Sequence, residues 1–187
     1  QAEDGIRDRS PSRGLGDVYK RQIIINAAGC GSTLVEYGEL LKGDPAWEER
    51  AEAFSAKVED LVTWLDESRF ALSGSDEKVT YHDACHLCHA QGISSKPRAL
   101  VKARSRDRFV ELAESDLCCG SAGSYNLTEP EMASRLQQRK VQHIIGSGAE
   151  VVVTTNPGCL LQIQSGLRKA GAHHVRAVHI ADYLLEG

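Results

Sequence analysis

Hydrophobic residues in this chain fall into two alternating patterns. Short apolar runs rich in Val and Ile predict buried strands, and these runs occupy residues 23–28, 78–83, 108–113, 150–155 and 173–178. Between them, apolar residues recur every three or four positions, which predicts helices at 44–65, 97–104, 128–146, 160–171 and 179–187. This alternation predicts an α/β fold in which helices flank a parallel sheet on both faces.

The longest of these predicted helices has a clear start signal. Asp44 can cap it, and Pro45 suits its first turn. Its apolar stripe, from residue 47 to residue 65, is interpreted as core packing and not as a cofactor-binding face. A Thr-x-x-Glu pattern at 128–131 predicts a capping box at the start of the third helix.

Two segments share a β-branched strand, a turn of small or Asn residues, and a Gly-Cys pair. They are IIINAAGC at 23–30 and VVVTTNPGC at 151–159. If they form an internal repeat, the chain contains the end of one unit and nearly all of a second. The alternative is a chance match between two strand ends. In either case, residues 29–31 and 156–159 are predicted to be turns.

Residues 1–22 show neither pattern. They have no apolar period and no signal-peptide h-region, and they resemble translated sequencing-adaptor read-through; a solvated native linker is the alternative. Because the first residue is Gln1 and the only methionine is Met132, we expect a fragment or a processed product. The expected organisation is a disordered, non-native leader at 1–22, the end of a first unit with a connecting helix at 23–78, and a second unit at 79–187.

Composition narrows the class of protein. The 187 residues include 22 Lys and Arg against 26 Asp and Glu, a net charge of -4, which argues against a non-specific nucleic-acid binder. The apolar runs are too short to span a bilayer, so no transmembrane segment is expected. Six cysteines without a secretory signal, two of them adjacent, favour a reduced cytoplasmic setting over a disulfide scaffold.

Four cysteines carry the candidate chemistry. Cys85, Cys118, Cys119 and Cys159 each follow a predicted strand, and in a parallel sheet such loops can meet at the carboxyl edge, where ligands bind. Four thiolates there suit an iron–sulfur cluster or a structural zinc ion. Zinc is disfavoured because the only Cys-x-x-Cys is at 85–88, whereas zinc knuckles use such pairs twice.

Three histidines surround the first of these cysteines. His82, His86 and His89 could donate to cluster sulfur or replace a thiolate ligand, although a structural or surface role is the simpler interpretation of each. The sequence has no dinucleotide-binding Gly-x-Gly-x-x-Gly after a strand, no Gly-x-Ser-x-Gly elbow and no His-Glu-x-x-His. It therefore indicates no nucleotide, hydrolase or zinc-protease site.

The spacing around the adjacent cysteines is unusual, with 32 residues before the pair and 39 after it. Here the chain resembles the cysteine-rich CCG family of heterodisulfide reductase, lactate-utilisation and glycolate oxidase iron–sulfur subunits, most closely the last. The resemblance covers Ile23 to Gly187. Its motifs are NAAGCGSTLVEYGELL, YHDACHLCHAQG, ESDLCCGSAGSYN with the helix that follows, and NPGCLLQIQSG.

The resemblance implies specific ligands. Cys85, Cys118, Cys119 and Cys159 would bind an iron–sulfur cluster, of 4Fe-4S type, and Cys30 would be the last cysteine of the preceding unit, a further ligand position. The fullest family pattern ends in Cys-x-x-Cys, but here Gln162 stands at the second position, so one thiolate is missing. Cys88 lies outside the family motif, and we expect it to be an ordinary buried or loop residue.

The resemblance also implies a function. The chain would be a fragment of the electron-transfer subunit of glycolate oxidase, an oxidoreductase, and would relay electrons from a flavin-containing partner that oxidises glycolate to glyoxylate. By itself it is expected not to be catalytic. It would be cytoplasmic, peripheral to the inner membrane through the complex. The alternatives are a lactate-utilisation or heterodisulfide-reductase-like subunit, and a non-redox interaction module stabilised by zinc.

Overall fold

The computed structural model describes residues 22–65 and 74–185 as an α/β protein with parallel sheets, as the pattern predicts. The strands are β1 (Ile23–Ile25), β2 (Val58–Asp60), β3 (Val79–His82), β4 (Val151–Thr154) and β5 (Arg176–His179). The helices are α3 (Ala28–Val35), α4 (Tyr37–Leu40), α5 (Glu48–Ser55), α6 (Leu61–Trp64), η2 (His86–Ala90), α7 (Ser95–Ser105), η3 (Arg106–Arg108), α8 (Tyr125–Thr128), α9 (Pro130–Gly146), α10 (Pro157–Lys169) and α11 (Ile180–Leu185).

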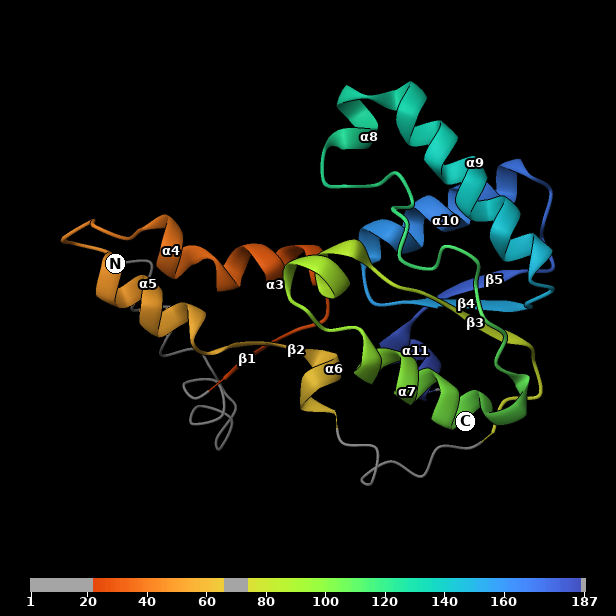
Figure 1. Cartoon of the computed structure of the whole chain (residues 1–187), viewed down its shortest axis with the longest axis horizontal. Helices are drawn as coiled ribbons and strands as arrows, with labels where there is room; N and C mark the ends of the chain where they lie inside the picture. Colours follow the sequence, from red (N-terminus) through yellow and green to blue (C-terminus); the bar gives the residue numbers. More distant parts are fainter. Residues whose placement is uncertain (1–21, 66–73, 186–187) are drawn as a thin grey trace, which may run out of the picture.

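The larger lobe, residues 74–185, is built on a sheet of strand order β3-β4-β5. Both strand pairs are parallel, so His82, Thr154 and His179 lie side by side at its carboxyl edge. In Figure 1, α9 and α10 cover one face of this sheet, and α7 and α11 cover the other. The central strand is fully buried, because Val151, Val152 and Val153 expose none of their surface. These helices and strands form the main core.

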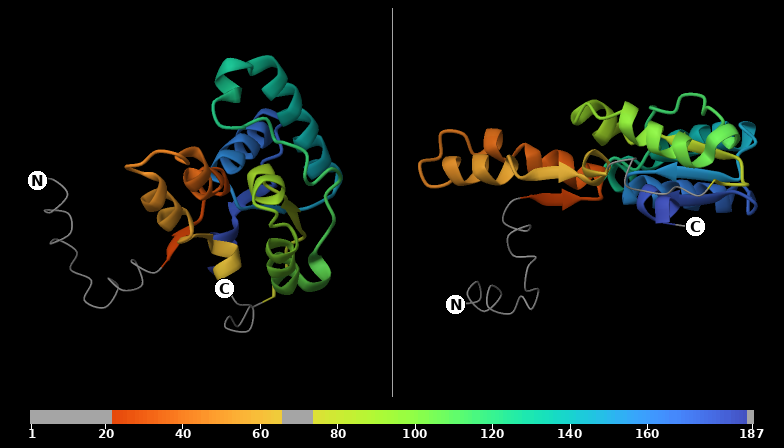
Figure 2. Two further views of the ribbon diagram at one scale, coloured as in Figure 1. Left: turned by 60° about the vertical axis from the view of Figure 1, so that its left-hand side comes forward. Right: turned by 90° about the horizontal axis from the view of Figure 1, so that it is seen from below.

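The smaller lobe, residues 22–60, contains the parallel pair β1-β2 and the helices α3 to α5. Figure 2 shows it extending away from the larger lobe. Its link to that lobe runs through the start of α3: the amide of Ala28 donates to the Thr155 carbonyl (3.5 Å), and the Gln91 side chain donates to the Ala28 carbonyl (3.1 Å). The carboxyl ends of β1 and β4 therefore face each other.

Most of the predicted elements in the larger lobe are confirmed. The strands at 78–83, 150–155 and 173–178 appear as β3, β4 and β5, and the helices at 97–104, 128–146 and 179–187 appear as α7, α9 and α11. The helix predicted at 160–171 is α10, which begins earlier, at Pro157, and is followed by Gly171 at a φ of 69°. No helix in the described parts of the chain is long and apolar enough to cross a membrane.

The single helix predicted at 44–65 is wrong. The segment contains α5, the strand β2 and α6, because Val58 to Asp60 pair with β1 instead of continuing the helix. Asp60 then starts α6 by accepting a hydrogen bond from the amide of Val62 (3.0 Å). The core role predicted for Trp47 is also wrong: its side chain is 49% exposed and lies against Arg50.

Four local predictions also need correction. The turn predicted at 29–31 belongs instead to the first turn of α3, and of the turn predicted at 156–159 only Asn156 lies outside α10, as its N-cap. The strand predicted at 108–113 is reduced to one bridge, between Phe109 and Val79. The capping box at 128–131 does not form, because no side chain caps α9. The strand β1 is only partly buried, with Ile24 36% exposed. Residues 1–21 of the predicted leader lie outside the described residues.

Candidate metal centre

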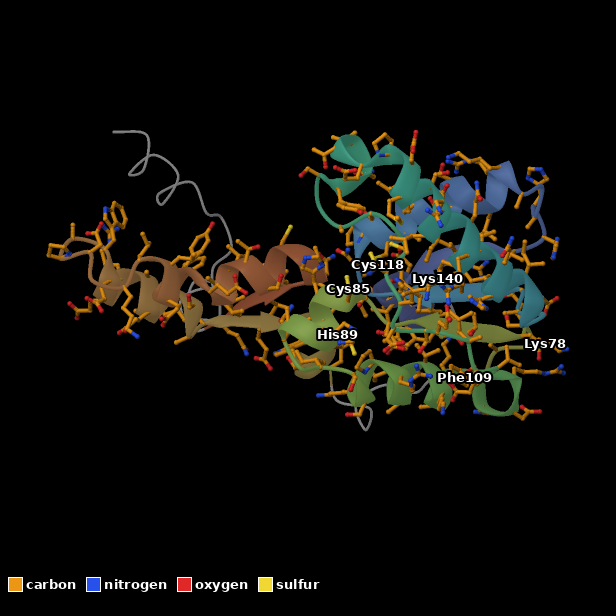
Figure 3. The ribbon with its side chains drawn as sticks, turned by 45° about the horizontal axis from the view of Figure 1, so that its top comes forward. Lys78, Cys85, His89, Phe109, Cys118 and Lys140 are labelled. Carbon is orange, nitrogen blue, oxygen red and sulfur yellow. The ribbon has the colours of Figure 1, made fainter. Side chains whose placement is uncertain are left out.

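Four cysteines converge at the carboxyl edge of the larger sheet. Cys85 lies just after β3, Cys118 and Cys119 lie in the loop before α8, and Cys159 is the third residue of α10, after β4. Figure 3 shows Cys85 and Cys118 close together on the side of the larger lobe that faces the smaller lobe. Cys119 and Cys159 are buried, and the other two are half-buried. The structure thus brings together the four thiols that the sequence singles out.

The thiols form a continuous row of hydrogen bonds. Cys119 and Cys85 both bond to Cys118 and hold the pKa of Cys118 down to about 2. Cys119 also bonds to Cys159 and lowers the pKa of Cys159 to about 4. Conversely, the pKa values of Cys85 and Cys119 are raised, because their protons are shared with these thiolates. Two of the four sulfurs are therefore already in the deprotonated form that binds metal.

Backbone and side-chain amides also support the thiolates. The amide of Gly120 donates to the sulfur of Cys118 (3.3 Å), and the side chain of Asn156 donates to that of Cys159 (3.4 Å). Cys159 also lies in the first turn of a thirteen-residue helix, whose N-terminal dipole favours negative charge. The two hydrogen bonds and the helix dipole all favour the ionised sulfur.

The tight turn at the cysteine pair depends on glycine. Gly120 has a φ of 89°, in the left-handed region, where a side chain is strained. A Cβ atom there would lie 2.3 Å from the carbonyl oxygen of Ala133, in α9. The residue after the pair must therefore be glycine if the two sulfurs are to lie under α9.

Two buried groups near the thiols carry nitrogen atoms. His82 is fully buried, and its Nδ1 lies 3.0 Å from the carbonyl oxygen of Ser115. Lys140, also fully buried, donates hydrogen bonds from Nζ to the carbonyl oxygens of Glu114 and Ser115. Burial lowers the pKa of Lys140, while the charge of Cys119 opposes this shift. Nothing in the sequence distinguishes Lys140 from any other charged residue of an amphipathic helix, so this residue could not be predicted.

The remaining candidates lie outside this row. Cys30 is exposed on α3, and Cys88 is half-buried in η2, where burial raises the pKa of its thiol. His86 contacts the site, with its Nδ1 3.5 Å from the sulfur of Cys85, whereas His89 is exposed. Gln162 accepts a hydrogen bond at its backbone carbonyl from Gln137 (2.8 Å).

Cys30 lines a cleft of about 650 Å³ between the two lobes, together with His86, Ser121, Asn156 and Gly158. The amide of Gly29 lies 3.4 Å from Oδ1 of Asn156 across this boundary. The two repeated segments therefore meet here, and each places its cysteine third in a helix that follows a parallel strand. The repeat inferred from the sequence is thus also a repeat of local structure.

Comparison with known proteins agrees with this arrangement. The profile of the CCG family, described as a cysteine-rich domain, matches residues 79–164. "Lactate utilization protein A" from an Exiguobacterium species is 33% identical over 170 residues, which cover 89% of this chain and 69% of that protein. The chain belongs to the CCG cysteine-rich family. Its matched residues span β3 to α10, the elements that carry all four converging cysteines.

Two longer relatives are also similar. The "Probable glycolate oxidase iron-sulfur subunit" of Bacillus subtilis (strain 168) is 45% identical over 170 residues, covering 88% of this chain. The "Glycolate oxidase iron-sulfur subunit" of Escherichia coli (strain K12) is 34% identical over 162 residues, covering 85% of this chain. The CCG chain described here spans only 38% and 39% of these two proteins, respectively.

Proposed function

We propose that this chain is part of the iron–sulfur electron-transfer subunit of a glycolate oxidase. The observation that carries the proposal is the row of hydrogen-bonded thiols formed by Cys85, Cys118, Cys119 and Cys159. The 45% identity to the Bacillus subtilis protein named as a probable glycolate oxidase iron-sulfur subunit favours glycolate oxidase over the lactate-utilisation relative, which is 33% identical. Electron transfer from a flavin-containing partner that oxidises glycolate to glyoxylate is the reaction we assign to the complex.

The chemistry of the donors fits an iron–sulfur cluster. Four sulfurs are the usual protein ligands of such a cluster, and two of them already favour the thiolate. The buried side chain of Lys140 lies close to Cys119, where negative charge favours the protonated form of Lys140 and would be partly offset by it. When bound, a 4Fe-4S cluster would supply one-electron redox chemistry. The chain's own residues would bind it, orient it and shield it from water.

The other parts of the proposal concern the whole protein. We assign residues 23–78 to the end of a first CCG unit and residues 79–187 to a second, with Cys30 as a cysteine of the first. The flavin and the glycolate site belong to the partner subunit, so that this chain is not catalytic on its own. We place the complex in the cytoplasm, peripheral to the inner membrane. Lactate is the alternative substrate of the complex, and a heterodisulfide-reductase-like role is the alternative within the family.

A structural zinc ion is the competing occupant of the same four sulfurs, because zinc also binds four thiolates. Anaerobic reconstitution of the purified chain with iron and sulfide separates the two. We expect bound iron and inorganic sulfide, with a broad sulfur-to-iron absorption in the visible range. A colourless protein that binds zinc stoichiometrically and takes up no iron would overturn the iron–sulfur assignment.

Single substitutions identify the ligands. Each of the changes Cys85→Ser, Cys118→Ser, Cys119→Ser and Cys159→Ser is expected to remove most of the bound iron. Cys88→Ser is the matched control, since Cys88 lies in η2, for which Cys85 is the N-cap residue, but outside the row of thiols. The ligand assignment fails if iron is retained in all four variants, or if Cys88→Ser alone abolishes it.

A further inference from the structure

The imidazole ring of His82 is held in one orientation by its surroundings. His82 is the last residue of β3 and exposes none of its surface. Its Nδ1 lies 3.0 Å from the carbonyl oxygen of Ser115. A carbonyl oxygen can only accept a hydrogen bond, so Nδ1 must carry the proton. In the neutral ring, Nε2 is then the nitrogen with the free lone pair.

The Ser115 carbonyl oxygen fixes the ring firmly because it also accepts two other hydrogen bonds. The amide of Asp83 donates to it over 3.1 Å, and Nζ of Lys140 donates to it over 3.2 Å. Three donors therefore converge on this one carbonyl oxygen, and the ring is fixed with Nδ1 towards Ser115.

The other nitrogen of His82 has no hydrogen-bond partner among the described residues, although it is buried. An unpaired buried polar atom is costly, and such an atom calls for a ligand or an ion. The ligating atoms of His82, Cys119 and Cys159 all lie within 4.8 Å of one another. The lone pair of Nε2 therefore lies beside two of the proposed cluster sulfurs.

From this geometry we infer that His82 is a nitrogen ligand of the metal centre held by Cys119 and Cys159. The inference rests on the proposed iron–sulfur function and extends it, because it gives the centre one imidazole ligand in addition to its thiolates. Imidazole replaces thiolate in some protein iron–sulfur centres, and a backbone carbonyl on the other ring nitrogen is the usual support for a metal-bound histidine. Ser115 is the residue that positions the ring.

Electron paramagnetic resonance tests whether a histidine nitrogen is bonded to the metal centre, and the measurement does not depend on enzyme activity. The whole chain is reconstituted anaerobically with iron and sulfide and then reduced. Two samples are compared by pulsed electron paramagnetic resonance: one with ordinary histidine, and one in which every histidine carries the heavier nitrogen isotope. We expect the strong coupling of a directly bonded nitrogen, which changes on labelling. It should be lost in His82→Gln and kept in His86→Gln, the matched control beside Cys85.

The outcomes separate this inference from the proposed function. The role of His82 is overturned if the bound cluster shows no coupling to a directly bonded histidine nitrogen, or if this coupling survives in His82→Gln. Either result leaves the proposed iron–sulfur function unaffected. A chain that takes up no cluster overturns both. His82 is buried, so if its variant does not fold, labelling of the unchanged chain and of His86→Gln decides: a coupling lost in His86→Gln assigns the nitrogen to His86 and overturns the role of His82. If the reduced centre is diamagnetic, the same labelling is performed on the chain loaded with Co²⁺ alone.

Discussion

Gly120 lies so close to Ala133 that no side chain fits between them. A Cβ at Gly120 would approach the Ala133 carbonyl oxygen to 2.3 Å, and it would also occupy a backbone with a φ of 89°. This contact fixes the loop of Cys118 and Cys119 beneath α9. Because backbone atoms form the contact, the structure cannot relieve it by moving a flexible side chain.

The first prediction concerns this contact. Gly120→Ala should lower the free energy of unfolding by about 3 kcal/mol and reduce cluster uptake, because both overlap and backbone strain oppose it. Gly123→Ala is the matched control: Gly123 has a φ of 61° but no atom within 4 Å of the added Cβ. In Gly123→Ala, backbone strain alone should lower the free energy of unfolding by about 1 kcal/mol. Denaturant unfolding measures the stability of each variant, and iron analysis measures its cluster uptake. Equal losses of stability and iron in the two variants would show that the contact between Gly120 and Ala133 does not cause the effect.

The second prediction follows from the shared protons of the thiols. In the metal-free chain, the pKa of Cys118 is lowered to about 2, so this residue is a thiolate across the neutral range. Its alkylation rate should be constant from about pH 5 to about pH 8. Burial raises the pKa of Cys88, so the rate at Cys88 should rise about tenfold per pH unit over the same range.

Peptide mass mapping after brief alkylation measures both rates in one sample. Fragmentation of the peptide distinguishes Cys118 from the adjacent Cys119. A rate at Cys118 that climbs with pH in parallel with the rate at Cys88 would contradict the hydrogen-bonded row of thiols.

The third prediction concerns Lys140. Lys140→Met keeps the size of the side chain but removes a buried positive charge near Cys119 and two hydrogen bonds to the carbonyl oxygens of Glu114 and Ser115. The reduction potential of the bound cluster should fall, because the added electron loses a nearby cation. The free energy of unfolding should fall by about 1–3 kcal/mol.

Redox titration of reconstituted protein checks this change against Lys102→Met. Lys102 is 46% exposed and pairs with Glu111 on the surface, so its loss should leave the potential unaltered. If the two variants have the same potential as the unchanged chain, Lys140 has only a structural role.

The fourth prediction concerns Asn156, which joins the two repeated segments. Its side chain donates to the sulfur of Cys159, with an Nδ2–Sγ distance of 3.4 Å, and accepts from the amide of Gly29. Asn156→Ala should raise the pKa of Cys159 from about 4, since the amide hydrogen bond favours the thiolate. Hydrogen exchange at the Gly29 amide should also become faster. Asn126→Ala, at an exposed position of α8, should change neither quantity.

Thiolate absorbance during an acid titration of the metal-free chain follows the pKa, and mass spectrometry follows the exchange. A pKa of Cys159 that stays the same in Asn156→Ala would mean that the hydrogen bond from Cys119 suffices to hold the thiolate.

The sequence alone determined much of the larger lobe. Runs such as Val151 to Val153 predict strands because their β-branched residues suit a sheet that is buried on both faces. In α9, apolar residues recur every three or four positions, and this local spacing predicts a helix. The four cysteines of the candidate site could also be selected from their spacing. These signals are local, or they repeat along the chain, so they can be read without knowing which elements meet.

The tertiary structure decided the rest. The apolar residues of segment 58–60 fit a helical period, and only pairing with β1, more than thirty residues earlier in the chain, makes the segment a strand. Nothing local distinguishes Lys140 from other charged helix residues, or His82 from His86 and His89; the packing of α9 over the 114–115 loop buries Lys140 and orients His82. Burial and hydrogen-bond partners are set by contacts between distant segments, and these contacts determine which titratable groups can serve the metal centre.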